Sequence, residues 1–237
     1  MRIRATFALV ASGFLVFFTA SARPPAAFLS YAYSGEKIIP TALPYTPQPQ
    51  SILTQANLDD DGGFEFLRLE DERLTIVSSG EPAWESPPHW QVKKAAMTDL
   101  NRDGRLEATL LVRRPFKPWP VDAFMPHGGR IDAYQDSHGY SCHIILIGWK
   151  RGAYRELWAG SAMSDPLLDI IAIDLDGDGR QELAALESRY DALPGAPAGA
   201  ITTWEWNGFG FTILARLPGS FNELAIDNVS GDILLAR

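Results

Sequence analysis

Three stretches of this chain place acidic or amide side chains at alternating positions of a nine-residue motif that ends in glutamate. They cover residues 57–65 (NLDDDGGFE), 99–107 (DLNRDGRLE) and 174–182 (DLDGDGRQE). Oxygen-bearing side chains at positions 1, 3 and 5 of a tight turn converge on one point, and the glycine at position 6 lets the chain reverse. A backbone carbonyl at position 7 and an acidic residue complete the shell. The motif therefore predicts loops that bind Ca²⁺, a cation that prefers oxygen ligands.

The alternative is that these Asp and Asn side chains only form Asx-turns between strands. Three or four carboxylates within a few ångströms repel one another strongly unless a cation is present, which favours calcium for the second and third motifs. The first motif begins with the neutral Asn57 and predicts a weaker site. A fourth copy at 227–232 (DNVSGD) has Val229 and Gly231 at ligand positions, so no metal is predicted there.

An EF-hand is excluded on two grounds. Its last carboxylate stands at position 12 of the loop, where this chain has Arg68, Leu110 or Ala185. The flanking segments are also typical of strands, since each motif is followed by a short apolar run.

The segments between the motifs predict antiparallel hairpins. Residues 144–158 and 201–215 each contain two apolar runs joined by a glycine-containing turn. One repeat is then about four short strands, the size of a propeller blade. The predicted fold is all-β, a propeller-like array of about four antiparallel four-stranded blades. The strand-like runs at 28–33 and 51–58 offer closure by pairing of the two termini. The alternative is an open arc, or part of a larger assembly.

Closure of the loop by a glutamate at position 9, between strands, resembles the calcium loops of FG-GAP and VCBS-type repeats of integrin-like β-propellers. The resemblance covers about residues 50–237 and implies a propeller-like fold with structural Ca²⁺. By that family pattern three sets of side chains would bind the metal. They are Asn57, Asp59, Asp61 and Glu65; Asp99, Asn101, Asp103 and Glu107; and Asp174, Asp176, Asp178 and Glu182.

The N-terminus predicts export. Arg2 and Arg4 precede an apolar stretch at 5–18, and Ala20-Ser21-Ala22 fits a signal-peptidase site. We expect a signal peptide at 1–22, an extended Pro-rich segment at 23–50 and the β-repeat domain at 51–237. An uncleaved anchor is disfavoured because a membrane span needs about 20 apolar residues. The expected location is secreted or extracytoplasmic, including the cell surface, with no membrane span after signal removal.

The net charge of -8 and the lack of any basic stripe argue against nucleic acid as a partner. The carboxylates of the three motifs account for this excess of negative charge. Such a local concentration of charge is expected of loops that bind cations. Cys142 is alone, so no intrachain disulfide can form.

An inserted loop at about 114–142 holds His127 and His138, next to His143. Their spacing matches no zinc pattern and favours ordinary packing over a metal or catalytic role. The sequence favours a non-catalytic module that binds an unidentified extracellular protein or glycan. The alternatives are an exported hydrolase or lyase that uses the inserted loop, and a purely structural surface protein.

Overall fold

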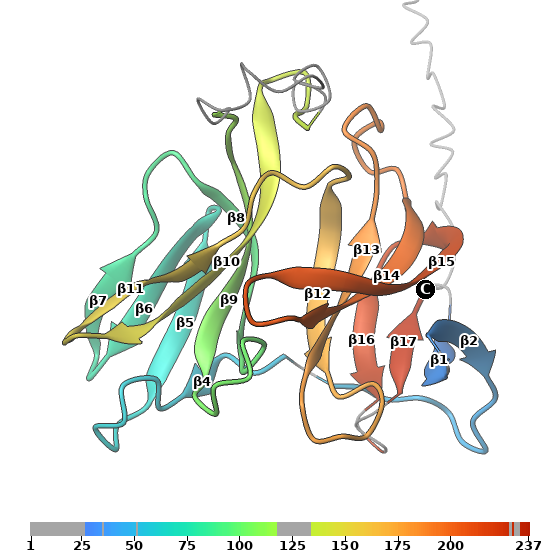
Figure 1. The fold of residues 1–237 in the computed structure, drawn as a ribbon, viewed down its shortest axis with the longest axis horizontal. Helices are drawn as coiled ribbons and strands as arrows, with labels where there is room; N and C mark the ends of the chain where they lie inside the picture. The colour runs from blue at the N-terminus through green and yellow to red at the C-terminus, as the bar shows by residue number, and fades with distance from the viewer. Residues whose placement is uncertain (1–26, 35, 51, 118–133, 228, 230–232) are drawn as a thin grey trace, which may run out of the picture.

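The computed structural model describes residues 27–237 apart from 35, 51, 118–133, 228 and 230–232. In this part the chain forms four antiparallel sheets arranged as a four-bladed β-propeller (Figure 1). The predicted signal peptide and most of the predicted inserted loop lie outside the described residues. Within the described residues, no helix has the length and apolarity that crossing a membrane requires.

The strands follow the chain from blade to blade. The first sheet contains β4 (Gln55–Ala56), β5 (Glu65–Glu70), β6 (Arg73–Ser78) and β7 (Glu81–Glu85). The second contains β8 (Gln91–Thr98), β9 (Glu107–Pro115), β10 (Tyr140–Lys150) and β11 (Ala153–Ala159). The third contains β12 (Leu167–Ile173), β13 (Glu182–Glu187), β14 (Ala198–Trp206) and β15 (Phe211–Phe221).

The fourth sheet joins the two ends of the described chain. It contains β1 (Leu29–Ser34), β2 (Lys37–Thr41), β3 (Pro49–Gln50), β16 (Leu224–Asp227) and β17 (Leu234–Ala236), in the order β2-β1-β17-β16-β3. β1 pairs with β17 in antiparallel register, with Leu29 opposite Ala236. The closed four-blade arrangement confirms the predicted fold. The segment predicted to be extended, 23–50, supplies three of these strands, so the propeller begins before residue 51.

The predicted hairpins are present. β10 and β11 are joined at Arg151 and Gly152, whose φ angles of 54° and 78° are both left-handed. Turns with two left-handed residues match the right-handed twist of paired strands. Gly152 adopts this conformation at little cost, whereas Arg151 is a residue type that rarely does. In the β14–β15 hairpin, the Asn207 side chain accepts the N–H groups of Phe209 and Gly210 and closes the turn.

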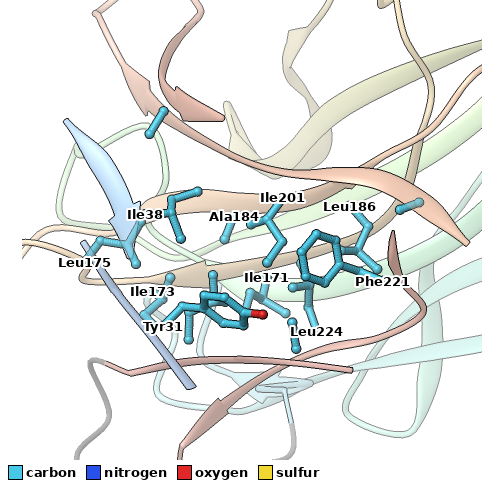
Figure 2. Packing of buried hydrophobic residues seen from close by; sticks show 14 residues of the cluster. Tyr31, Ile38, Ile171, Ile173, Leu175, Ala184, Leu186, Ile201, Phe221 and Leu224 are labelled. Carbon is cyan, nitrogen blue, oxygen red and sulfur yellow. The ribbon is translucent and has the colours of Figure 1, made fainter. Parts of the chain in front are cut away.

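The buried hydrophobic residues lie mainly between blades. One cluster joins the first and second sheets, one the second and third, and one the third and fourth. Figure 2 shows the last of these, where Tyr31 of β1 meets Phe221 of β15 edge to face at 6.1 Å. β9, β10 and β13 lie inside the second and third sheets and are buried over most of their length. Because alternate residues of a strand face opposite sides of the sheet, these strands pack mainly apolar side chains on both faces.

Candidate metal centre

The three acidic loops occupy equivalent places in three blades. Loop 1 (57–65) connects β4 to β5, loop 2 (99–107) connects β8 to β9, and loop 3 (174–182) connects β12 to β13. β8 of the second blade contacts β12 of the third, and Arg105 of loop 2 pairs with Asp60 of loop 1. All three loops therefore emerge at the same end of the ring, the lower end in Figure 1.

Each loop has left-handed backbone at motif positions 4 and 6. The residues are Asp60 (63°) and Gly62 (89°), Arg102 (60°) and Gly104 (82°), and Gly177 (78°) and Gly179 (84°). Glycine adopts this conformation at little steric cost, and position 6 is glycine in all three loops. Position 4 is glycine only in loop 3, so loops 1 and 2 carry a side chain there in a conformation that L-residues rarely adopt.

Side-chain oxygens at positions 1, 3 and 5 fold each loop by accepting its own backbone N–H groups. In loop 3, Asp174 accepts from Gly177 and Gly179, each at 2.8 Å, and Asp176 accepts from Asp178 at 3.2 Å. The bonds in loops 1 and 2 are of the same kind. These are Asx-turns, the geometry of the turn-only alternative, and they direct several carboxylates inward together.

The glutamate at position 9 is buried in each loop and accepts the N–H of the leucine at position 2. The pairs are Leu58 to Glu65 at 2.7 Å, Leu100 to Glu107 at 3.0 Å and Leu175 to Glu182 at 2.9 Å. The glutamates are 0%, 1% and 2% exposed. The buried leucine and the buried glutamate thus fix both ends of the loop against the blade, and the second carboxylate oxygen remains to be satisfied.

Acidic oxygens gather within 4.8 Å of one another in every loop. The groups are Asp59, Asp61 and Glu65; Asp99, Asp103 and Glu107; and Asp174, Asp176 and Glu182. These three clusters could each hold a metal ion, and they contain nine of the twelve residues that the sequence predicted. Of the others, Asn57 and Asn101 accept loop N–H groups. Asp178 lies outside the cluster of loop 3 and accepts the Arg180 N–H at 2.8 Å.

Burial makes ionisation of these clusters costly. Desolvation raises the pKa of Glu107 from 4.5 to about 8, despite hydrogen bonds from Leu100 and Thr98 that favour the carboxylate. Desolvation also raises the pKa of Asp99, Asp59 and Glu182. Like charges nearby add to the effect, which is the electrostatic environment that a bound cation reverses.

Of the three loops, loop 2 is the best suited to a cation, because one of its buried carboxylate oxygens has no hydrogen-bond partner. Glu107 Oε1 accepts N–H of Leu100 and the Thr98 hydroxyl, whereas Glu107 Oε2 is buried with no hydrogen-bond partner. A buried carboxylate oxygen without a partner costs free energy that a coordinated metal would recover. With Asp99, Asn101 and Asp103 around it, the donor set is all oxygen, which suits a hard cation such as Ca²⁺.

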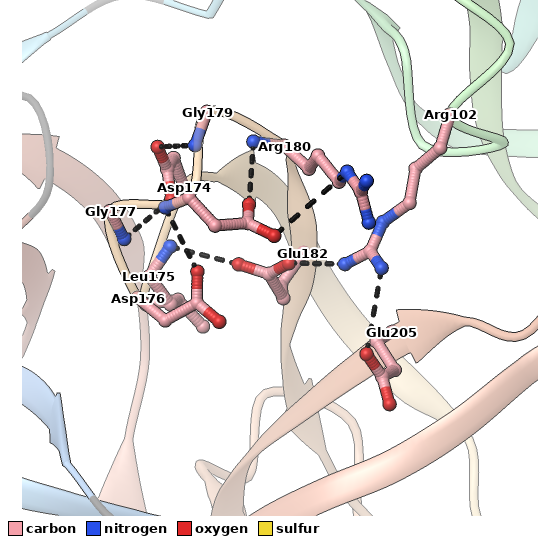
Figure 3. A network of polar contacts seen from close by, with 10 residues as sticks. Arg102, Asp174, Leu175, Asp176, Gly177, Gly179, Arg180, Glu182 and Glu205 are labelled. Carbon is pink, nitrogen blue, oxygen red and sulfur yellow. Dashed lines mark hydrogen bonds and ion pairs between the residues drawn. The ribbon is translucent and has the colours of Figure 1, made fainter.

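In loop 3 an arginine already contacts the buried glutamate. Arg102 reaches across from loop 2 and pairs with Glu182 Oε1, while its other terminal nitrogen lies 3.5 Å from Glu205 (Figure 3). Loop 2 contacts loop 3 a second time, since Gln181 accepts the Asp99 N–H at 2.8 Å. In loop 1, the corresponding oxygen of Glu65 accepts the Ser78 hydroxyl at 3.0 Å.

The fourth motif uses its first aspartate for a different purpose. Asp227 is fully buried and accepts the Tyr45 hydroxyl at 2.7 Å and the Gln48 N–H at 3.0 Å. It therefore binds the N-terminal segment to the last blade. Val229 is exposed, while positions 228 and 230–232 lie outside the described residues.

Among the described residues, no histidine joins any of these clusters. His143 is buried on β10, where Ser141 and the Gly160 carbonyl contact its ring nitrogens at 2.7 and 2.9 Å. His138 is exposed, and His127 lies outside the described residues. Cys142 is buried and unpaired by disulfide. Within the described residues, the groups able to hold a metal contain only Asp and Glu.

No family model matches this chain, and no curated protein matches its sequence. The resemblance to FG-GAP and VCBS-type repeats therefore rests on the loops and their setting. Sequence reasoning missed Arg102, Ser78 and Tyr45 as partners of motif carboxylates, because each of them lies outside the motif whose carboxylate it contacts. The local signal that could have singled out Arg102 is an arginine at position 4, where loop 1 has Asp60 and loop 3 has Gly177.

Proposed function

We propose that this protein is an exported, calcium-stabilised β-propeller of the FG-GAP/VCBS type that acts as a non-catalytic binding or adhesion module. Its partner would be an extracellular protein or glycan. Calcium would bind in loops 1, 2 and 3 and fix one end of the ring, so that surface loops could present a binding surface on a rigid scaffold.

The ligand chemistry supports calcium over other metals. Every loop offers carboxylate oxygens, and loops 1 and 2 add an Asn amide oxygen; within the part of the chain that the structure describes, no Cys or His joins these clusters to favour zinc or copper. The loops are irregular and partly exposed, which suits the variable geometry and larger coordination number of Ca²⁺ better than the strict octahedron of Mg²⁺. The single observation that carries the proposal is Glu107 Oε2, a buried carboxylate oxygen without a hydrogen-bond partner inside an acidic loop.

The lack of a disulfide makes a metal useful to the fold. Cys142 is buried and unpaired, so the blades are joined only by packing, hydrogen bonds and ion pairs. A ligand that binds only the folded state stabilises it by about 2.7 kcal/mol when present at about 100 times its Kd. Bound calcium would therefore serve the role that disulfides serve in other exported proteins.

Thermal unfolding with and without calcium tests the metal. We expect Tm to rise by about 5–10 °C between chelator and saturating Ca²⁺ for a chain of this size, with a smaller rise in Mg²⁺. Glu107→Gln, which keeps the shape of the side chain and removes its charge, should reduce the calcium-dependent rise. An unchanged Tm at millimolar Ca²⁺ would refute calcium binding.

The partner requires a separate test. The calcium-loaded protein should bind one class of ligand on glycan and extracellular-protein arrays, and chelator should weaken that binding. Absence of binding on both arrays would favour a purely structural surface protein instead. A hydrolytic activity that persists in chelator would contradict the non-catalytic assignment.

A further inference from the structure

The three loops provide an internal comparison, because the same oxygen of the position-9 glutamate meets a different partner in each. One oxygen always accepts the leucine N–H. The other accepts a neutral hydroxyl from Ser78 in loop 1 and a guanidinium from Arg102 in loop 3. In loop 2 it has no partner. The three acidic clusters therefore start with different amounts of charge compensation.

Arg102 is well placed to act as a counter-charge. Its side chain is 15% exposed and that of Glu182 is 3% exposed, so solvent screens the pair weakly. Glu205 lies on the other side of the guanidinium at 3.5 Å. Figure 3 shows the arginine entering from loop 2 and ending beside the carboxylate of Glu182. The Arg102 Nε is buried without a hydrogen-bond partner, so charge pairing, more than hydrogen-bond completeness, holds the side chain there.

The backbone explains how the side chain reaches the neighbouring blade. Arg102 stands at position 4, in left-handed conformation. The position-4 residue of loop 1, Asp60, is likewise directed between blades and pairs with Arg105 of loop 2, although both of those side chains are about half exposed or more. In loop 3 the position is Gly177, which has no side chain to extend. Position 4 therefore connects loops 1 and 2 to a neighbouring blade, and of these two side chains only Arg102 brings a largely buried charge into the neighbour's acidic cluster.

We propose that Arg102 is a built-in counter-cation of loop 3, so that calcium binds first and most tightly at loop 2 and more weakly at loop 3. This inference rests on the proposed calcium binding and specifies its order. The Arg102 guanidinium neutralises Glu182 and repels a second cation that shares the same carboxylate. Loop 2 gains calcium without such competition, since Glu107 Oε2 has no other partner.

The test removes the charge and follows calcium binding by calorimetry and by Tm. Arg102→Gln keeps a polar side chain without the charge, and Arg102→Gly also relieves the left-handed strain, as Gly177 does in loop 3. The loop 3 binding event is identified as the one that Asp176→Asn abolishes. We expect both Arg102 variants to tighten that event by about tenfold. Both should lower Tm in chelator and widen the gap between chelator and calcium.

A matched control is available at the same interface. Lys94 of β8 pairs with Asp169 of β12, and their side chains are 22% and 14% exposed. Lys94→Gln therefore removes one partly buried positive charge between the same two blades, several residues before loop 3. It should lower Tm in chelator as well, and it should leave the affinity of loop 3 unchanged.

The outcomes separate the two proposals. If the wild-type protein takes up no calcium, the proposed function is wrong. If it takes up calcium, and both Arg102 variants leave the loop 3 event unchanged or weaken it, Arg102 is a positioning residue for Glu182 and the counter-cation inference is wrong. Abolition of the tightest event by Glu107→Gln supports the binding order, and retention of that event overturns it.

Discussion

At the scale of single residues, the loops show how one motif can hold three electrostatic states. The position-9 glutamates have the same backbone partner and similar burial, yet Glu107 keeps an unpaired oxygen and Glu182 an arginine. The partners beyond the leucine N–H differ, and all of them come from outside the motif: Ser78 in loop 1, Thr98 in loop 2 and Arg102 in loop 3. Identical ligand patterns in a sequence therefore do not imply equal affinities, because buried charges are sensitive to every neighbouring group.

His143 predicts a pH dependence that is independent of the loops. Burial lowers its pKa from 6.5 to about 4, and nearby Arg114 and Arg113 also favour the neutral ring. The unfolded chain therefore binds one more proton than the folded chain between those pH values. Stability contributed by neutral His143 is fully present above pH 6.5 and is lost as pH falls towards 4, at about 1.4 kcal/mol per pH unit.

Urea unfolding in chelator at several pH values between 7 and 4 measures this slope. His143→Gln should be less stable than wild type at pH 7, since the Ser141 and Gly160 contacts change, and its stability should fall less steeply with acid. Comparing the two slopes cancels the carboxylates that titrate in both proteins. Parallel slopes would show that His143 does not titrate in this range.

At the scale of strands and loops, local sequence patterns predicted the hairpins and the acidic loops, but they did not predict contacts between residues far apart in the chain. The hairpin of β10 and β11 follows from alternating apolar residues around Arg151-Gly152, and each acidic loop follows from its own nine residues. β2 and β7 each contain a proline, Pro40 and Pro82, and are short edge strands, so their composition gave little strand signal. Contacts such as Arg102 with Glu182, 80 residues apart, depend on blade geometry that no local pattern encodes.

An aromatic cluster between the second and third blades gives a prediction at this scale. Trp158 of β11 packs edge to face against Trp206 and Phe211 of the β14–β15 hairpin, each at 5.4 Å. Gly160 leaves room for the indole, since an added Cβ there would lie 2.7 Å from the ring. Trp158→Ala should lower the free energy of unfolding by about 2 kcal/mol, less than for a fully buried tryptophan because the ring is partly exposed.

Phe209, at the tip of the same hairpin, is the matched control. Its side chain is 89% exposed, so Phe209→Ala should change stability by about 0.5 kcal/mol or less. Denaturant unfolding of the two variants gives the comparison directly. Equal effects would mean that the cluster does not connect the two blades.

At the scale of the whole molecule, the ring is closed by chain ends and not by a metal loop. β1 lies between β2 and β17, so the fourth blade needs both ends of the described chain. Pairing of this kind leaves β17 with a partner on each side and removes an exposed sheet edge. Closure also explains why the fourth motif differs from the others, since its Asp227 accepts hydrogen bonds from the N-terminal segment. The first three motifs each bring several carboxylates together, whereas the aspartate of the fourth motif accepts hydrogen bonds from Tyr45 and Gln48.

Closure of this kind makes the Tyr45 hydroxyl a stabilising group for the ring. Tyr45→Phe removes the donor at 2.7 Å from a fully buried Asp227 carboxylate, and loss of a hydrogen bond to a charged group costs about 1.5–3 kcal/mol. We expect Tm to fall and amide exchange to rise first in β1 and β17, the strands that join the ends. The gap between chelator and calcium should stay as in wild type, because loops 1 to 3 keep all their oxygens. Uniform loss of protection across all four sheets would instead mean that the ring opens only as one cooperative unit.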